Sequence, residues 1–412
     1  MNIKDEAQYE IGRLPGYDDT PPKERVIYPP LTTEELLQVL GLTIKSDETN
    51  KVIAFLGLLS AYTEDSQLNI AFNAPSSTGK TYIPLEIAAL FPKEDVWTGG
   101  YCSPTAFFHE IGRINEEGQI VVEFKGRILI FLDMPNPQVV QKLRPVLSHD
   151  TREISVKVTD TQKSVGLRTK NVIMIGFPVV VFCSAGLKFN EQEATRFFLL
   201  SPEISQEKIR AAIHEKVLKE SHPDGYRSVL ENNAARANLI KRIVAIKDEG
   251  ITSITIPCHE KIRDTFLSNR TMLKPRDARD IAKILALTKI FALLNLWDRT
   301  RDGTTIAANE DDADNALRLW EDIRKPQEYN LSPYVYGVYE NIILPLFEAQ
   351  TSRQGVYREE IARKHQEIYE RPLLDWQLRR EILPMLTTAG LIVQEPDQYD
   401  RRRMIIRLPD TK

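Results

Sequence analysis

The stretch LNIAFNAPSSTGKTYIPL, residues 68–85, has the pattern of a short strand, a phosphate-binding loop and the start of a helix. Apolar residues alternate with others up to Phe72, small and polar residues follow, and apolar side chains return after Gly79-Lys80-Thr81. This is the end of a P-loop, G-x-x-x-x-G-K-[ST], in the strand-then-helix context that the motif requires. The stretch therefore predicts nucleotide binding, against the alternative of an ordinary strand-to-helix turn.

Each part of this loop has a physical role in holding a triphosphate. Gly79 lets the backbone bend so that successive N–H groups face an anion at a helix N-terminus, Lys80 reaches the β- and γ-phosphates, and the Thr81 hydroxyl ligates Mg²⁺. Ala74 replaces the first glycine of the motif, and Pro84 falls near the start of helical hydrogen bonding, which leaves the shape of the loop open. The residues expected to contact the nucleotide are Ala74, Pro75, Ser76, Ser77, Thr78, Gly79, Lys80 and Thr81.

Length and composition bound the class of protein. A chain of 412 residues is long enough for two or three domains, and a net charge of −4 excludes a generally polycationic protein. Cys102, Cys183 and Cys258 form no C-x-x-C pair, which argues against a zinc site and a disulfide framework. The N-terminus has no apolar run of signal length, and no later segment is apolar enough to span a bilayer, so the cytosol is the expected compartment.

A carboxylate, Asp133, directly follows the apolar run ILIFL, residues 128–132. An unbroken apolar run of this length is typical of a strand buried on both faces, and the carboxyl edge of a parallel sheet is where an α/β domain binds its ligand. Asp133 is therefore predicted to share Mg²⁺ with Thr81. The alternative is a carboxylate that only caps the next turn.

A basic β-hairpin is predicted over residues 151–176. Residues 153–158 alternate between apolar and polar, a polar loop follows, and NVIMIG returns as a second strand. Its tip and flanks carry Arg152, Lys157, Lys163, Arg168 and Lys170. This segment is either a solvated basic loop or a finger that contacts DNA phosphates.

The rest of the chain divides into segments by pattern. PVVVFCSAG is another buried strand that ends at Ser184, Arg196 leads into a further strand, and Arg276 lies at the charged start of a broad apolar helix. We expect an irregular N-terminal arm over 1–30, an α/β nucleotide-binding domain over 31–204, a helical lid over 205–326 and a separate domain over 331–412.

The last domain has three helical segments followed by two strands, which is the order of a winged helix. Arg379 and Arg380 on its third helix and Arg401, Arg402 and Arg403 between its strands are candidates for DNA contact. The alternative is a winged helix that docks a protein, because acidic neighbours dilute the charge.

This order of parts resembles the AAA+ core of minichromosome-maintenance helicases, especially the short relatives carried by phages, plasmids and other mobile elements. The resemblance covers about residues 31–323, and the C-terminal domain is also similar to that family's winged helix. It implies an α/β AAA+ P-loop core with a parallel sheet and a helical lid, followed by a C-terminal winged-helix domain. No zinc-bearing N-terminal domain is recognisable in the sequence.

The resemblance also implies roles for individual residues. Asp133 would order the metal, Ser184 would be sensor 1, Arg196 would be the arginine finger that acts on the ATP of the next subunit, Arg276 would be sensor 2, and Lys163 would touch DNA in a central channel. Because the finger completes a neighbour's site, the resemblance implies a ring, a hexamer in that family, with ATP and Mg²⁺ as cofactors.

One departure from the family pattern affects the expected turnover. The family places a glutamate directly after the aspartate, where it polarises the attacking water, and this sequence has Met134. Methionine cannot accept a proton. Either Asp133 serves both metal and water, or another carboxylate such as Glu110 reaches in, or hydrolysis is slow; Asn136 can only orient a water.

Two functions from different classes follow. The leading one is an ATP-dependent DNA translocase or helicase that acts as a ring in the replication of a mobile element. The alternative is a weakly hydrolysing, ATP-binding initiator or loader that assembles on DNA through its winged helix. A signalling ATPase whose winged helix binds protein is a third.

Overall fold

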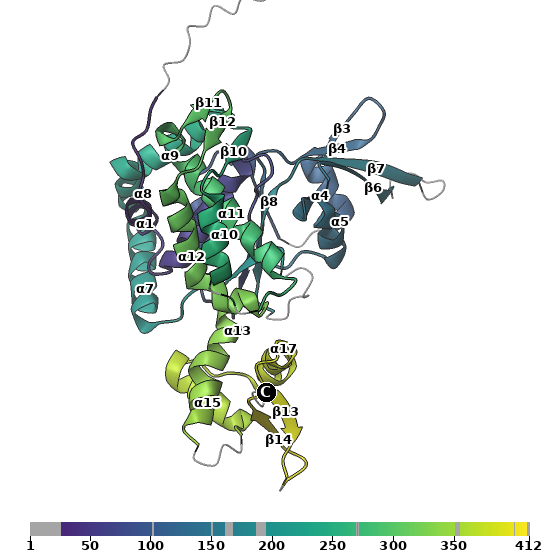
Figure 1. Cartoon of the computed structure of the whole chain (residues 1–412), viewed down its shortest axis with the longest axis vertical. Helices are drawn as coiled ribbons and strands as arrows, with labels where there is room; N and C mark the ends of the chain where they lie inside the picture. The colour runs from purple at the N-terminus through teal and green to yellow at the C-terminus, as the bar shows by residue number, and fades with distance from the viewer. Residues whose placement is uncertain are drawn as a thin grey trace, which may run out of the picture.

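The computed structural model describes residues 26–100, 103–149, 151–160, 168–186, 195–268, 270, 272–350, 355–398 and 400–409 (Figure 1). Most of the expected N-terminal arm and the tip of the expected hairpin lie outside these residues. Within the described part, no helix combines the length and the apolar character that crossing a bilayer requires.

A five-stranded parallel sheet forms the centre of the molecule. Its strands are β1 (Asn69–Asn73), β2 (Val96–Gly99), β5 (Ile128–Phe131), β8 (Val179–Ser184) and β9 (Phe197–Leu200), in the order β2-β5-β8-β1-β9. Each neighbouring pair is parallel. The carboxyl ends of β1, β8 and β5 therefore meet at one edge, where the segments after them can share a ligand.

Side chains of the sheet alternate between two buried layers because successive residues of a strand point to opposite faces. Ile70 and Phe72 belong to one layer and Ala71 to the other. Helices α2 (Glu48–Leu59), α3 (Tyr82–Ala88), α9 (Ala234–Asp248), α11 (Asp277–Leu294) and α12 (Glu310–Glu328) contribute to the first layer. Helices α4 (Pro104–Ile111) and α5 (Pro137–Leu147) contribute to the second, on the other side of the sheet.

A second sheet carries the predicted hairpin. It has the order β3-β4-β7-β6, formed by β3 (Arg113–Ile114), β4 (Ile120–Glu123), β6 (Glu153–Asp160) and β7 (Arg168–Ile175). β6 and β7 pair in antiparallel register from Glu153↔Ile175 to Asp160↔Arg168, and they project from the core (Figure 1). Ile154 and Val156 pack on the second layer of the core, so the predicted alternation is confirmed.

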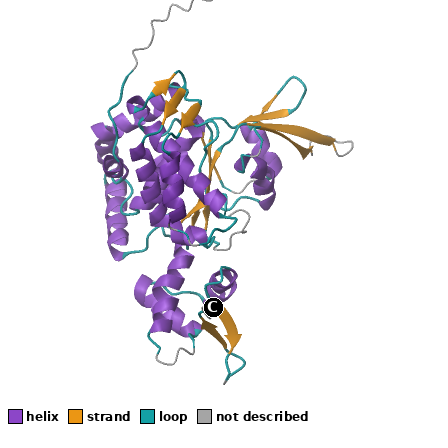
Figure 2. Ribbon diagram, viewed as in Figure 1, coloured by secondary structure: helices purple, strands orange, loops and turns teal. Residues whose placement is uncertain are grey.

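Residues 205–326 are mainly helical. They form α7 (Gln206–Ser221), α8 (Pro223–Glu231), α9, α10 (His259–Ser268), α11 and most of α12, with a small sheet of β10 (Ser253–Thr255), β11 (Arg301–Asp302) and β12 (Thr305–Ala307) (Figure 2). α12 passes through Pro326, where the sequence predicted a boundary, and ends at Glu328.

Near the N-terminus of the described part, α1 (Thr33–Leu40) begins at a capping box. The Thr32 hydroxyl accepts from the Glu35 N–H at 3.1 Å, and the Glu35 carboxylate accepts from the Thr32 N–H at 2.9 Å.

The C-terminal module, residues 331–409, has its own buried core and lies below the main body in Figure 1. Its first helix runs through α13 (Pro333–Val338), a π-helical turn η4 (Tyr339–Ile343) and α14 (Leu344–Glu348). Its second is α15 (Arg358–Tyr369), and its third runs through α16 (Asp375–Gln377), η5 (Leu378–Ile382) and α17 (Leu383–Thr388). The hairpin β13 (Val393–Pro396) and β14 (Met404–Arg407) follows, and Val356 forms an isolated bridge with Ile406.

Candidate nucleotide site

The P-loop connects β1 to α3 in a conformation that needs two left-handed residues. Ser77 has φ 64° and Gly79 has φ 93°. An added Cβ on Gly79 would meet no atom within 4 Å, so backbone conformation rather than space favours glycine there. Ala74 is buried, and its N–H donates to the Ser184 carbonyl at 3.3 Å. The loop thus forms without the first motif glycine.

Partners outside the loop hold its carbonyl groups. The Ser76 carbonyl accepts from Arg371 Nη1 at 2.8 Å, and the Thr78 carbonyl accepts from Lys208 Nζ at 3.4 Å. In a trans peptide the N–H points opposite to the carbonyl. The N–H groups of the next residues therefore face away from these cations, which is the arrangement of an anion-binding nest at a helix N-terminus.

Pro84 does not disturb the helix that follows. It is the third residue of α3, where an N–H has no intrahelical partner in any case. The Tyr82 and Ile83 N–H groups instead donate to the Gly79 carbonyl at 3.0 and 3.2 Å. The helix therefore starts directly behind Lys80 and Thr81.

Lys208 was not identified from the sequence. Its ammonium forms an ion pair with Asp47, whose side chain is 0% exposed, and it also donates to the Glu203 carbonyl at 3.0 Å. The other Asp47 oxygen accepts from Asn50 Nδ2 at 2.9 Å. Lys208 thus links α7, the turn before α2 and the phosphate loop.

Asp133 and Ser184 lie at the same sheet edge as the P-loop. Ser184 pairs with Asn73 at the end of β1, and Asp133 follows β5, the strand on the other side of β8. Ser184 Oγ donates to the Gly186 carbonyl at 2.9 Å, which accepts from Asn73 Nδ2 at 2.7 Å as well. The edge therefore carries the polar groups that the sequence predicted for it.

Cys183, one residue before Ser184, lies close to both Lys80 and Asp133. Burial raises the pKa of its thiol to about 12; the Lys80 charge opposes this rise and the Asp133 charge adds to it. The thiol donates to the Lys80 carbonyl at 3.4 Å. A neutral thiol thus lies under the phosphate loop, between the lysine and the aspartate.

Met134 occupies the position of the water-activating glutamate, and Asn136 and Glu110 are polar groups considered for a role at the attacking water. Met134 is half-buried, and its N–H donates to Asp133 Oδ1 at 2.8 Å. Asn136 caps α5, where its side chain accepts from the Gln138 N–H at 2.9 Å. Glu110 accepts from Trp97 Nε1 at 3.0 Å beside β2, with β5 and β8 between it and the P-loop strand.

A cavity of about 730 Å³ opens beside the P-loop. Apolar parts of Ile44, Tyr82, Ile83 and Ile209 line it, together with Ser77 to Gly79 of the loop and Tyr369 to Arg371 of the C-terminal module. The Tyr82 hydroxyl donates to the Thr43 carbonyl at 2.9 Å. Charged side chains, among them Lys208 and Arg371, also line it, whereas Lys80 and Thr81 do not. The recess therefore fits the base of a nucleotide rather than its phosphates.

The site also fits Mg²⁺ bound together with a triphosphate. Thr81 and the exposed Asp133 supply oxygen ligands, which Mg²⁺ prefers. The described residues contain no cluster of three His, Cys, Asp or Glu side chains that could hold a metal ion alone. Phosphate oxygens and water would therefore complete the coordination.

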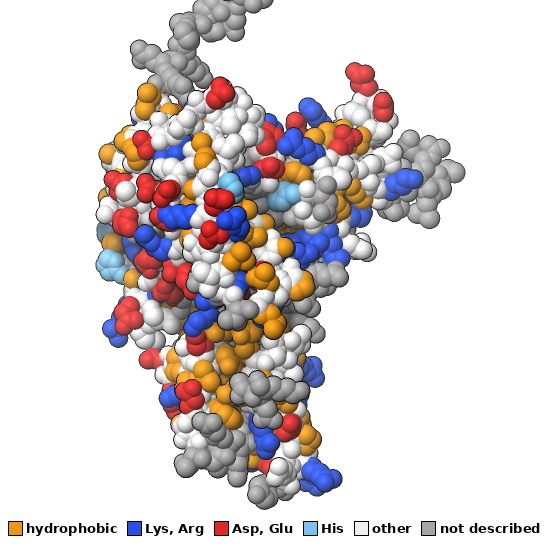
Figure 3. Space-filling model, in the orientation of Figure 1, with side chains coloured by type: hydrophobic (Ala, Val, Ile, Leu, Met, Phe, Trp, Pro, Cys, Tyr) orange, Lys and Arg blue, Asp and Glu red, His pale blue; other side chains and the backbone are white. Residues whose placement is uncertain are grey.

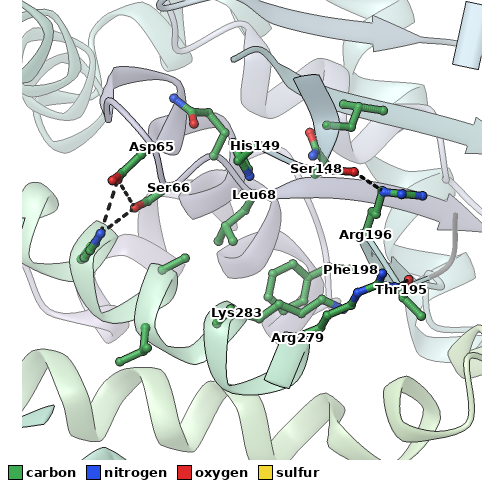
Figure 4. Close-up of a pocket in the computed structure, with 17 residues that line it drawn as sticks. Asp65, Ser66, Leu68, Ser148, His149, Thr195, Arg196, Phe198, Arg279 and Lys283 are labelled. Carbon is green, nitrogen blue, oxygen red and sulfur yellow. Dashed lines mark hydrogen bonds and ion pairs between the residues drawn. The ribbon is translucent and has the colours of Figure 1, made fainter. Parts of the chain in front are cut away.

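Arg196 lines a second cavity, of about 680 Å³, at the opposite edge of the sheet (Figure 4). It lies directly before β9, whose first residue pairs with the first residue of β1, and its Nε donates to Ser148 Oγ at 2.6 Å. His149, Arg279 and Lys283 line the same cavity. This second cavity is therefore rich in cationic side chains.

Arg276 does not line the Arg196 cavity. Its Nε pairs with Asp280 at 3.0 Å, and its Nη1 donates to Asn330 Oδ1, close to the start of the C-terminal module. Arg279, one turn further along α11, lines the cavity and donates to Thr195 Oγ1. Arg279 stands only three residues after Arg276 in the sequence, and no local pattern singles it out.

The structure describes only some of the residues predicted to contact DNA. Lys163 and the side chains of Arg168 and Lys170 lie outside the described residues, whereas Lys157 is exposed on β6. Arg379, Arg380, Arg401, Arg402 and Arg403 are all exposed on the C-terminal module, and Arg403 is paired with Glu359 at 3.4 Å. Basic and acidic side chains alternate over the face of the main body drawn in Figure 3, which shows no single large basic surface there.

No protein-family model matches this sequence, and comparison with curated proteins gives no match either. Among solved structures, the chain is similar to a full-length MCM homolog from Methanopyrus kandleri, with 13% identity and a TM-score of 0.42, over 70% of this chain and 58% of that one. It is also similar to the SCCmec type IV Cch active helicase, with 9% identity and a TM-score of 0.34, over 92% and 71%. A third similarity is to the ADP form of the Aeropyrum pernix ORC2 protein, with 12% identity and a TM-score of 0.21, over 94% and 92%.

The chain thus spans 58% of the length of the MCM homolog. These TM-scores are low, so the fold assignment rests on the chain's own sheet and loop. The predicted α/β fold class, with a parallel sheet and a mainly helical region after it, is confirmed, and the AAA+ assignment stays a prediction. The winged-helix assignment stays a prediction.

Proposed function

We propose that this chain binds and hydrolyses ATP with Mg²⁺ and uses it to move along DNA as a ring of identical subunits, a hexamer, in the replication of a mobile element. The observation that carries the proposal is the position of Arg196 relative to its own P-loop. An arginine that belongs to a nucleotide site but lies far from the site of its own chain requires a second copy.

The separation follows from strand geometry. Arg196 precedes Phe197, which pairs with Asn69 at the start of β1, and the P-loop begins after Asn73 at the other end. A strand of five residues spans about 16 Å, which is longer than an arginine side chain. Arg196 therefore serves an ATP bound by the neighbouring subunit.

The chemistry needs positive charge more than covalent catalysis. Transfer of the γ-phosphoryl group to water develops charge on the phosphate oxygens, which Lys80 in one subunit and Arg196 in the next would stabilise. Arg279 lines the same cavity as Arg196. We assign the sensor 2 role to Arg279. The resemblance gave this role to Arg276, but the Arg276 side chain is bonded to Asp280 and Asn330.

DNA contact is assigned to two parts of the chain. The hairpin β6–β7 belongs to the second sheet and projects from the core, and its basic residues suit phosphate contact in a central channel. The C-terminal module has three helices, a hairpin and an exposed Trp376 beside Arg379 and Arg380, which supports a winged helix that contacts duplex DNA.

Met134 supports a second candidate. Because no proton acceptor follows Asp133, hydrolysis would be slow, and the protein would act as an ATP-dependent initiator or loader that assembles on DNA. Slow turnover with retained nucleotide binding would distinguish this function from that of a motor.

The experiment that separates the candidates is a strand-displacement assay with ATP, run beside a measurement of particle mass with and without nucleotide and DNA. A motor unwinds and forms a ring, a loader assembles without unwinding, and a protein-docking switch does neither. Lys80→Ala should abolish ATP turnover and weaken nucleotide binding, with Lys93→Ala, at an exposed lysine outside the loop, as the matched control. Unchanged turnover in Lys80→Ala would remove the assignment of the site.

A further inference from the structure

The C-terminal module contacts the start of the P-loop directly at one point and through Ser201 at another. Arg371 Nη1 donates to the Ser76 carbonyl at 2.8 Å, across 295 residues of sequence. At the other point, the Tyr334 N–H donates to Ser201 Oγ at 3.0 Å, and Ser201 Oγ donates to the Asn73 carbonyl at 2.6 Å. The module therefore holds residues 73–76 at both ends.

His365 joins these two points inside the module. Its Nε2 lies 2.9 Å from the Tyr334 hydroxyl, and its Nδ1 lies 2.9 Å from the Arg371 carbonyl. A carbonyl can only accept, so Nδ1 carries a proton, and a neutral ring then accepts from the tyrosine at Nε2. The ring is 1% exposed, and burial lowers its pKa, which favours this neutral form. His365 thus fixes the backbone of Arg371 relative to Tyr334.

Arg371 acts on the peptide group that begins the anion nest. By holding the Ser76 carbonyl outward, it directs the Ser77 N–H to the other side of the loop. Ser77 adopts φ 64°, a left-handed conformation that non-glycine residues avoid without external support. A charged hydrogen bond to the preceding carbonyl supplies such support.

The same residues form part of the wall of the nucleotide cavity. Tyr369, Glu370 and Arg371 line the cavity of about 730 Å³ together with Ser77 and Gly79. The seating of the module therefore shapes both the loop and the recess beside it.

We propose that Arg371 is a positioning residue of the nucleotide site, supplied by the C-terminal module of the same chain, and that it couples the seating of this module to nucleotide binding. The inference rests on the proposed nucleotide-binding function. Linkage makes the coupling reciprocal: nucleotide that favours the loop conformation stabilises the seated module, and the seated module raises nucleotide affinity. Because all contacts lie within one chain, the coupling does not need ring assembly.

The test is an equilibrium titration of the full-length chain with a fluorescent ATP analogue and Mg²⁺. Arg371→Ala should weaken binding about three- to tenfold, the range for loss of one hydrogen bond of ordinary net strength, and Arg371→Lys should restore part of the affinity. Arg358→Ala is the matched control, because Arg358 also lies in the module but pairs with Asp375 at 3.1 Å, away from the loop. This control should bind nucleotide as the wild type does.

Hydrogen exchange gives a readout that a purely structural residue would not change. Nucleotide should slow amide exchange over residues 365–373 in the wild type and in Arg358→Ala, and this slowing should be lost in Arg371→Ala. If Arg371→Ala does not fold, Arg371→Gln carries the same test with a donor of shorter reach.

Wild-type affinity and unchanged nucleotide-dependent protection in Arg371→Ala would overturn this inference alone. A wild-type chain that binds no nucleotide would overturn the proposed function and this inference together.

Discussion

Met134 is the residue that bears most directly on the rate of the proposed ATP hydrolysis, because it stands directly after Asp133. The backbone hydrogen bond from its N–H to the Asp133 carboxylate fixes the geometry of this pair. A carboxylate at this position would lie beside the residue that is expected to order the metal. If methionine at this position makes ATP hydrolysis slow, a carboxylate introduced there should therefore raise the rate.

Met134→Glu should raise ATP turnover about tenfold or more, because a positioned general base contributes rate only where it can accept a proton. Met134→Gln is the control of matched shape without that ability, and it should turn over no faster than the wild type. Steady-state ATPase rates at saturating ATP measure the effect. Equal rates in all three proteins would mean that the side chain at this position does not reach the attacking water.

Lys283 is buried in the cationic cavity, where its ammonium donates to the Phe197 carbonyl at 3.0 Å and lies 5.1 Å from the Phe198 ring centroid. Burial lowers its pKa to about 7, and nearby Asp280 only partly opposes the shift. The folded chain therefore releases this proton at a pH where the unfolded chain, with a lysine pKa of about 10.4, still holds it.

Stability should rise with pH across this window, because the unfolded state binds more protons than the folded one between about pH 7 and pH 10. Lys283→Met should remove this contribution, so its unfolding temperature should change less between pH 7 and pH 9 than that of the wild type. If the unfolding temperature depends on pH in the same way in the wild type and in Lys283→Met, the pKa of Lys283 is not lowered in the folded chain.

At the scale of elements, the hairpin β6–β7 is expected to carry movements at the nucleotide site to the DNA. β7 is continuous with the segment that leads into β8, the strand that carries Cys183 and Ser184 to the nucleotide edge. A movement at that edge can therefore reach the hairpin through a short connection.

Lys163→Glu should reduce DNA-stimulated ATPase activity several-fold and leave the basal rate unchanged, because it reverses charge at the proposed DNA contact and not at the nucleotide. Lys93→Glu makes the same charge change at an exposed site away from the hairpin and should affect neither rate. ATPase titrations with single-stranded DNA at two salt concentrations measure both rates. An equal loss of basal and stimulated activity would favour a structural role for the hairpin.

The elements that the sequence predicts best are those with a local cause. The P-loop, the buried strand before Asp133 and the alternation in β6 each follow from residues a few positions apart, and the structure has all three. The small sheet of β11 and β12 was missed because strands of two and three residues are too short to show a period.

The parts of the site that were missed depend on long-range contacts. Lys208 and Arg371 bind P-loop carbonyls from 130 and 295 positions away, and no local pattern marks either residue. Arg276 and Arg279 share one helix start, and only the packing of α11 against the segment before β9 shows which of them lines the Arg196 cavity.

At the scale of the whole molecule, the two cavities lie at opposite ends of strand β1. The nucleotide cavity joins the P-loop to the C-terminal module, and the cationic cavity carries Arg196. A closed ring of identical copies places unlike surfaces of neighbouring subunits against one another. One such contact can bring the Arg196 cavity of each subunit to the nucleotide of the next.

The most direct measurement mixes two inactive variants. Arg196→Ala alone and Lys80→Ala alone should each lose nearly all ATPase activity, because a finger acting from the next subunit contributes about a thousandfold or more. In an equal mixture that is shown to co-assemble, about a quarter of the interfaces pair an intact Lys80 with an intact Arg196, and activity should recover in proportion. A co-assembled mixture no more active than its two components would contradict a site shared between subunits.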